Sequence, residues 1–209
     1  MIVVTPAAPV HVEEAVRVLV DAFRTDAVMS AFVRGDQEER ERRLTHLLRV
    51  MVRNGLRHGV VDLARAEEDQ TLLGVAVWMR PGQRGEGLLD HLRNAGSYLR
   101  AFGLRGLRRA AELEHVLHLA RPAEAHWHLQ AIGVHSAGRG LGVGSALLDA
   151  RLSTVDRSPA YLEASTERSA ALYARFGFTA TGRIEGFPAS ARPIPMWRTG
   201  RDRDLAHQG

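Results

Sequence analysis

The stretch that decides the fold is residues 138–148, which reads GRGLGVGSALL. Glycines occupy alternate positions of its first half, and the residues before it have the composition of a strand. Glycines let consecutive amides face one point, and the unpaired amides and dipole of a new helix favour an anion there. A turn that only capped a helix would need one glycine rather than four. The stretch therefore predicts a strand over 127–134, a pyrophosphate-binding turn, and a helix over 140–155.

The spacing of these glycines excludes two common nucleotide-binding motifs. The dinucleotide fingerprint G-x-G-x-x-G fails in every register, because its third glycine would fall on Val143, Ser145 or Leu147. A Walker loop requires lysine before serine or threonine, and the chain has no lysine. The turn therefore has to hold a different kind of nucleotide.

The rest of the chain continues the alternation of strands and helices. Apolar periodicity predicts two helices before the main sheet, one over 12–23 and one from Asp36 that Gly55 and Gly59 help to end. A block rich in arginine, leucine and alanine, residues 81–125, is predicted to be a helical insertion. A further helix is expected over 167–176. Strands are expected at 2–5, 60–66, 71–79, 127–134, 160–165, 178–182 and 194–197.

The order strand, helix, strand, helix from residue 127 onwards indicates a crossover connection, which places the strands 127–134 and 160–165 parallel and adjacent. Ligands are expected at the carboxyl ends of these strands. We therefore predict an α/β (α+β) fold with a mixed sheet of about six to seven strands flanked by helices. A single domain is expected over 1–200, with a polar tail over 201–209.

Composition narrows the possible functions. The 209 residues contain no cysteine and no lysine, which excludes disulfides, thiolate metal sites, thiol intermediates and Schiff-base chemistry. No apolar run approaches the length needed to cross a bilayer, so we expect no membrane partner and a cytoplasmic location. The arginine bias is typical of a GC-rich bacterial genome. Arg105, Arg108 and Arg109 have helical spacing without stacking aromatics, so no nucleic-acid partner is expected despite a net charge of +4.

Two ordered motifs resemble the GNAT N-acetyltransferases. Residues 139–144, RGLGVG, match the (Gln/Arg)-x-x-Gly-x-(Gly/Ala) signature of that family, and residues 162–165 with 171–178, LEAS and ALYARFGF, are similar to its second signature. Residues 126–129 and 196–198, HWHL and MWR, also resemble the puromycin-type branch. Ser136 and Ala137 replace the family's usual acidic-proline turn, and Thr166 replaces a common asparagine, although Thr166 remains a good helix N-cap.

The resemblance implies acetyl-CoA as the cofactor, splayed central strands, and pantetheine bound along the freed edge at residues 132–134. It implies that an amide near Val134 faces the acetyl oxygen. Gly133 inside this strand is typical of a bulge or a close backbone approach. The cofactor-binding residues are expected to be Ile132, Gly133, Val134, Arg139, Gly140, Leu141, Gly142, Val143, Gly144, Ser145, Thr166, Ser169, Tyr173 and Arg175.

Acetyl transfer to an amine requires a proton donor for the leaving thiolate and a base for the ammonium. The resemblance implies that Tyr173 is the general acid, since its helical neighbours leave it free to face the cleft. The base is left open between His128, Glu163 and a carboxylate not yet located, each acting through water. Glu163, with apolar neighbours in its strand, is expected to be either paired with arginine or poised in the cleft.

Two other functions are compatible with the residues. His115, His118, His126 and His128 have spacings that could compose a zinc site for a hydrolase, although no carboxylate at fixed spacing accompanies them. A catalytically silent acyl-CoA-binding module is the second alternative. The favoured interpretation is an N-acetyltransferase that acts on the primary amine of a small molecule by direct attack in a ternary complex, needs no metal, and is a monomer or homodimer.

Overall fold

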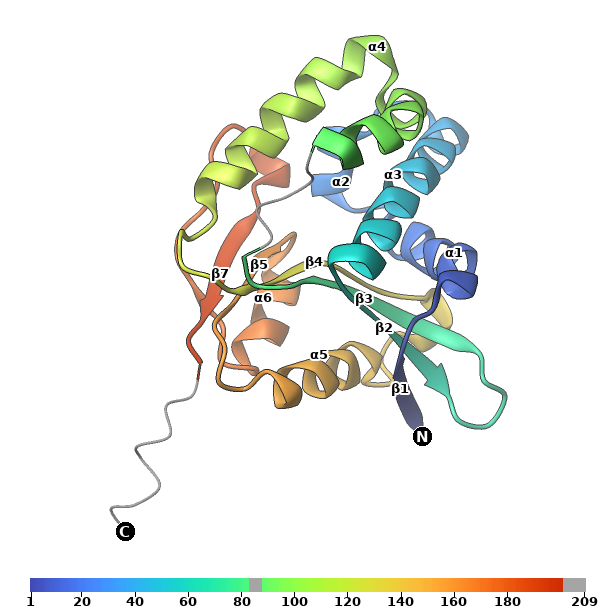
Figure 1. Cartoon of the computed structure of the whole chain (residues 1–209), viewed down its shortest axis with the longest axis vertical. Helices are drawn as coiled ribbons and strands as arrows, with labels where there is room; N and C mark the ends of the chain where they lie inside the picture. Colours follow the sequence, from blue (N-terminus) through green and yellow to red (C-terminus); the bar gives the residue numbers. More distant parts are fainter. Residues whose placement is uncertain (83–87, 201–209) are drawn as a thin grey trace.

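A computed structural model describes residues 1–82 and 88–200 (Figure 1). The predicted polar tail, 201–209, and the part of the predicted insertion at 83–87 lie outside the described residues. A seven-stranded mixed sheet forms the centre of the molecule, with the strand order β1-β2-β3-β4-β5-β7-β6. The predicted α/β (α+β) class and strand number are confirmed.

The strands pair antiparallel except at one junction. They are β1 (Ile2–Pro6), β2 (Gly59–Ala66), β3 (Leu72–Met79), β4 (Trp127–Val134), β5 (Ala160–Ala164), β6 (Thr179–Ala180) and β7 (Ile194–Arg198). β4 and β5 are parallel, as the crossover through a helix requires. The strand expected over 178–182 is only two residues long, because Thr179 and Ala180 are the only residues there that pair with β7.

Helices cover both faces of the sheet (Figure 1). On one face lie α1 (Val12–Phe23), α2 (Ala27–Phe32), α3 (Gln37–His58) and α4 (Leu88–Ala120), and on the other lie α5 (Val143–Thr154) and α6 (Glu167–Ala174). Each face has its own apolar core, one centred on Leu19, Leu48 and Val75, the other on Trp78, Leu147 and Leu162. No helix in the described part of the chain has the length and apolar character needed to span a membrane.

Two local predictions need correction. Three α-helices rather than two precede β2, because a short helix, α2, begins at Ala27 after the N-cap Asp26, whose carboxylate accepts a hydrogen bond from Met29 N at 2.8 Å. The helix expected over 140–155 begins at Val143, since Gly140 and Gly142 have φ angles of +81° and +77° that no helix contains. The predicted helical insertion is present as α4, with its two helical parts meeting at Gly103, which has a non-helical φ of +64°.

The parallel strands separate after a short contact. β4 and β5 pair only at their first three residues, Trp127–Leu129 with Ala160–Leu162, although β4 continues to Val134. A bulge at Gln130 shifts the register between β3 and β4 just where the strands begin to part. The predicted splay is therefore present, and it opens the sheet at the carboxyl ends of these two strands.

Candidate functional site

The glycine turn presents a row of unpaired amides. The first amide of α5 with a partner is that of Ala146, which donates to Gly142 O at 2.9 Å. Within the described residues, no hydrogen bond is found for the amides of Gly140, Gly142, Val143, Gly144 and Ser145. An added Cβ at Gly140 or Gly142 would meet no atom within 4 Å, so the turn is uncrowded at these two positions. This arrangement suits a diphosphate group at a helix N-terminus.

The residues just before the glycine turn are held to α1 by the side chain of Asp21. Ser136 N donates to Asp21 Oδ2 at 2.6 Å, and this contact joins the end of β4 to α1. Burial alone would raise the pKa of Asp21, but the hydrogen bond from Ser136 outweighs burial and lowers that pKa. Ser136 and Ala137 stand where the resembled family usually has an acidic residue and a proline. Here Asp21 of α1 supplies the carboxylate next to this turn.

A single cavity of about 810 Å³ begins at the splayed strands and extends beneath α4. Several of the predicted cofactor ligands lie in its wall, namely Ile132, Gly133, Val134, Arg139, Thr166, Ser169 and Tyr173. Residues Gly140, Leu141, Gly142, Val143, Gly144, Ser145 and Arg175 lie outside that wall. The side chain of Val143 is buried in the core, so Val143 can offer a ligand only its amide. Arg175 is exposed at the C-terminal end of α6.

The second half of β4 has one free edge. Ile132, Gly133 and Val134 pair with β3 on one side, while β5 has already diverged on the other. Gly133 does not form the bulge, which lies at Gln130. Its role is a close approach, because a Cβ there would lie 2.8 Å from Ala22 Cβ of α1. The backbone of this edge is consequently available to a chain-like ligand that hydrogen-bonds as a further strand would.

Thr166 and Ser169 form a capping box at the start of α6. Ser169 N donates to Thr166 Oγ1 and Thr166 N donates to Ser169 Oγ, both at 3.1 Å. Both side chains therefore serve the helix while they also line the cavity.

Tyr173 lies on α6 with its ring edge-on to Phe178 at 6.3 Å, and only 7% of the residue is exposed. It lines the cavity as well, so it belongs both to the core and to the site. Burial raises the pKa of Tyr173 well above its usual value, and the nearby carboxylate of Asp26 raises it further. The phenol accordingly keeps its proton throughout the neutral range, as a proton donor must.

His128 and Glu163 meet across the paired part of β4 and β5. His128 Nε2 lies 2.8 Å from Glu163 Oε2, and Arg121 Nε lies 3.6 Å from Glu163 Oε1. Burial alone would raise the pKa of Glu163, but His128 and Arg121 outweigh burial and hold that pKa below its usual range. Both alternatives expected for Glu163 hold, since it is paired with arginine and also faces the cavity.

His115, His118 and His126 do not gather with His128 into a metal site. His126 packs edge-on against Tyr161 and Trp197, with both ring centroids 5.5 Å away. No group of three or more potential ligands that could hold a metal ion occurs among residues 1–82 and 88–200. His115 and His118 do line the cavity.

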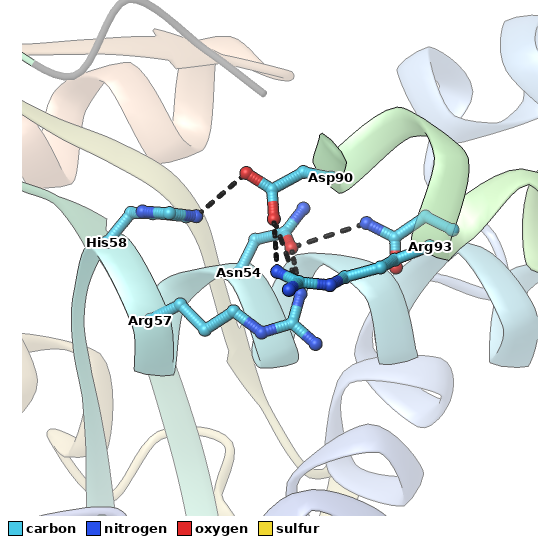
Figure 2. Close-up of polar contacts among 6 residues, drawn as sticks. Asn54, Arg57, His58, Asp90 and Arg93 are labelled. Atoms are coloured by element: carbon cyan, nitrogen blue, oxygen red, sulfur yellow. Dashed lines mark hydrogen bonds and ion pairs between the residues drawn. The ribbon is translucent and has the colours of Figure 1, made fainter. Parts of the chain in front are cut away.

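A polar network joins the end of α3 to the start of α4, above the cavity (Figure 2). Asp90 Oδ2 lies 2.9 Å from His58 Nε2, and Asp90 Oδ1 lies 3.5 Å from Arg57 Nη1. In the same network, Asn94 Nδ2 donates to Asn54 Oδ1 at 3.4 Å. Asp90 is buried, so this network fixes the first turn of α4 over the cavity. His58 and Asn54 also line the cavity.

Sequence reasoning missed the cavity residue Asp26. It lies between α1 and α2, lines the cavity, and is close enough to Tyr173 to affect its pKa. The sequence did contain one signal for Asp26: aspartate is among the preferred N-cap residues, and Asp26 is the N-cap of α2. Its proximity to Tyr173 is a long-range contact that periodicity does not reveal.

Residues 111–180, which contain β4, α5, β5 and α6, match the acetyltransferase (GNAT) domain. A Corynebacterium glutamicum protein, described as a histone acetyltransferase HPA2 and related acetyltransferase, superposes with a TM-score of 0.76 at 26% identity, over 98% of this chain and 99% of that chain. Residues 111–180 are therefore similar to the GNAT acetyltransferase domain, and nearly the whole chain shares the fold of an acetyltransferase. Members of the GNAT family are acyltransferases that typically use acetyl-CoA.

Two structures of lower sequence identity share the fold. Arylalkylamine N-acetyltransferase 2 from Aedes aegypti superposes with a TM-score of 0.66 at 15% identity, over 96% of this chain and 99% of that chain. The C-terminal condensation domain of Ebony, solved in complex with β-alanyl-dopamine, superposes with a TM-score of 0.62 at 11% identity, over 95% and 98% of the two chains. At these identities the likeness establishes the fold alone.

Proposed function

We propose that this protein is an acetyl-CoA-dependent N-acetyltransferase that acts on the primary amine of a small molecule by direct attack in a ternary complex. The observation that carries the proposal is the row of unpaired amides at the glycine turn, beside a cavity that also contains Tyr173. Acetyl-CoA would supply the acetyl group as a thioester. The amine in the name of the Aedes aegypti relative favours an amine acceptor.

Residues of the chain have separate parts in this proposal. The unpaired amides of Gly140 and of residues 142–145 bind the diphosphate, and the free edge of Ile132–Val134 orients the pantetheine arm. The amide of Val134 is directed at the acetyl oxygen, where a hydrogen-bond donor stabilises developing charge. Tyr173, protonated because of burial, donates its proton to the departing sulfur.

The pair His128–Glu163 is the proposed route for the amine proton. His128 lines the cavity and is oriented by Glu163, an arrangement in which a carboxylate positions an imidazole for proton transfer. A water molecule between the amine and His128 would carry the proton.

Two measurements test this function. In thermal unfolding, acetyl-CoA at 100 times its dissociation constant should stabilise the protein by about 2.7 kcal/mol, while NAD and ATP should not. Thiol release measured over a panel of amines should then show turnover. Binding without turnover for every amine would favour the silent acyl-CoA-binding module, and the absence of any acetyl-CoA effect would refute both interpretations.

A further inference from the structure

The part of the cavity beyond the splayed strands is a chamber with an apolar wall. Seven partly buried side chains pack against the core on one side and line the cavity on the other, namely Phe23, Met29, Phe32, Leu47, Met51, Tyr98 and Leu107. Their remaining apolar surface faces the cavity, so a ligand that covers it gains the free energy of apolar burial. The chamber therefore suits a molecule with an apolar body.

Rings dominate two walls of this chamber. Phe32 of α2 lies edge-on to Phe187 at 5.9 Å, and Tyr98 and Phe102 of α4 stack at 6.0 Å with an interplanar angle of 9°. The network of Asp90, His58 and Arg57 holds α4 in place above them (Figure 2). Fixed aromatic walls favour a flat or ring-containing ligand, because ring pairs gain energy beyond the area they bury.

Among the described residues, three carboxylates line the cavity, those of Asp26, Glu114 and Glu163, and Asp26 alone of these forms no ion pair with a described residue. Glu163 is paired with His128 and Arg121, and Glu114 is paired with Arg121 at 3.2 Å. Asp26 accepts a hydrogen bond from Met29 N through Oδ1, and no ion pair of Asp26 is found among the described residues. An anion that faces an apolar cavity without a counter-charge is a site for a cationic group.

Asp26 lies at the edge of the apolar chamber. It caps α2, whose Met29 and Phe32 belong to the apolar wall, and it lines the same cavity as Tyr173, the proposed donor to the leaving sulfur. The charge of Asp26 also raises the pKa of Tyr173. A ligand ammonium at Asp26 would place the rest of the molecule among the rings of α1, α2 and α4.

We propose that the acceptor is a cationic amine with an aromatic or alkyl body, whose ammonium group is bound by Asp26 while its body occupies the chamber beneath α4. This inference rests on the proposed N-acetyltransferase function and specifies its substrate class. Asp26 acts here as a specificity-determining residue for the amine.

The charge of Asp26 can be tested without loss of its capping role. Asp26→Asn keeps a good N-cap for α2 and removes the negative charge. The matched control is Asp36→Asn, because Asp36 caps α3 in the same way, accepting from Glu39 N at 2.9 Å, but is exposed and outside the cavity wall. Binding of 2-phenylethylamine in the presence of coenzyme A is measured by calorimetry, and KM is measured by thiol release.

Asp26→Asn should weaken 2-phenylethylamine binding by at least about tenfold, the loss typical of a charge-assisted hydrogen bond, and leave acetyl-CoA affinity unchanged. Asp36→Asn should have no effect on either. Equal binding by both variants would overturn the inference and leave the N-acetyltransferase function intact. Calorimetry measures amine binding even where no amine is turned over. Thiol release tests the N-acetyltransferase function, so failure of that function can be distinguished from failure of this inference.

The apolar body is tested with straight-chain amines from propylamine to hexylamine. Affinity should rise about fourfold per methylene until the chamber is filled, because each buried methylene contributes a constant increment. Ethanolamine and putrescine, which place a polar group among the rings, should bind at least tenfold more weakly than 2-phenylethylamine. A flat series, or a preference for the hydrophilic amines, would overturn the assignment.

Discussion

Arg151 of α5 and Asp62 of β2 form a bidentate ion pair, with Nε to Oδ2 at 3.0 Å and Nη2 to Oδ1 at 2.6 Å. The Asp62 side chain is 4% exposed and that of Arg151 is 16% exposed, so the pair is shielded from water. Arg151 also lies over the ring of Trp127 at 5.9 Å. Through this pair, the helix that begins at the glycine turn is fixed to the sheet.

We expect Asp62→Ala to destabilise the protein by about 3 kcal/mol, because it leaves the Arg151 charge buried without a partner. The matched control is Glu13→Ala, which breaks a pair with Arg49 of the same bidentate form, where Glu13 is 55% exposed. That control should cost less than about 1 kcal/mol. Urea unfolding measures both, and equal losses would show that burial does not determine the strength of the Asp62 pair.

The left-handed glycine of the turn should affect both stability and cofactor binding. Gly140→Ala is expected to destabilise by about 1–2 kcal/mol, because a Cβ is unfavourable at a φ of +81°. It should also weaken acetyl-CoA binding, since the turn amides would be displaced. Gly82→Ala is the control, because Gly82 has the same φ and an equally open surrounding but lies far along the chain from the turn. Cofactor affinity that falls equally in both variants would argue against a diphosphate site.

Removal of one hydroxyl tests the proposed acid. Tyr173→Phe should lower kcat by about 10²–10⁴-fold with little change in acetyl-CoA affinity. Ser153→Ala is the comparison, because it removes an exposed hydroxyl of α5 that is not part of the cavity wall. It should retain wild-type turnover. Because burial raises the pKa of Tyr173 above its usual 10.0, wild-type kcat should show no loss of this acid up to pH 10. Unchanged turnover in Tyr173→Phe would reject the assignment.

The buried pair of Glu163 with His128 and Arg121 should make stability depend on pH. The pKa of Glu163 is depressed in the folded state, so its contribution is present above the usual value of 4.5 and is lost as the pH falls through the lower folded-state pKa. The melting-temperature difference between the wild type and Glu163→Gln should therefore be fully developed above pH 4.5 and shrink below it. A difference that persists unchanged at pH 3 would mean that the charge of Glu163 is not its source.

Much of the fold follows from features local in the chain. The glycine turn and α5 were predictable because backbone freedom at glycine and helical periodicity are properties of neighbouring residues. The short helix α2 was missed because six residues are too few to show a period, and the strand over 178–182 was overestimated because its length depends on pairing with β7.

The sequence by itself determined the order of strands and helices and the family-like turn, including the candidate residues Tyr173, His128 and Glu163 as types able to move protons. Tertiary structure decided which of them meet. The 2.8 Å contact of His128 with Glu163 depends on strand register, and the proximity of Asp26 to Tyr173 depends on how α2 packs. Such contacts join residues far apart in the chain, and only packing of the whole molecule specifies them. Hydrophobic burial is non-directional, so strand register and the shapes of the packed side chains decide which residues meet.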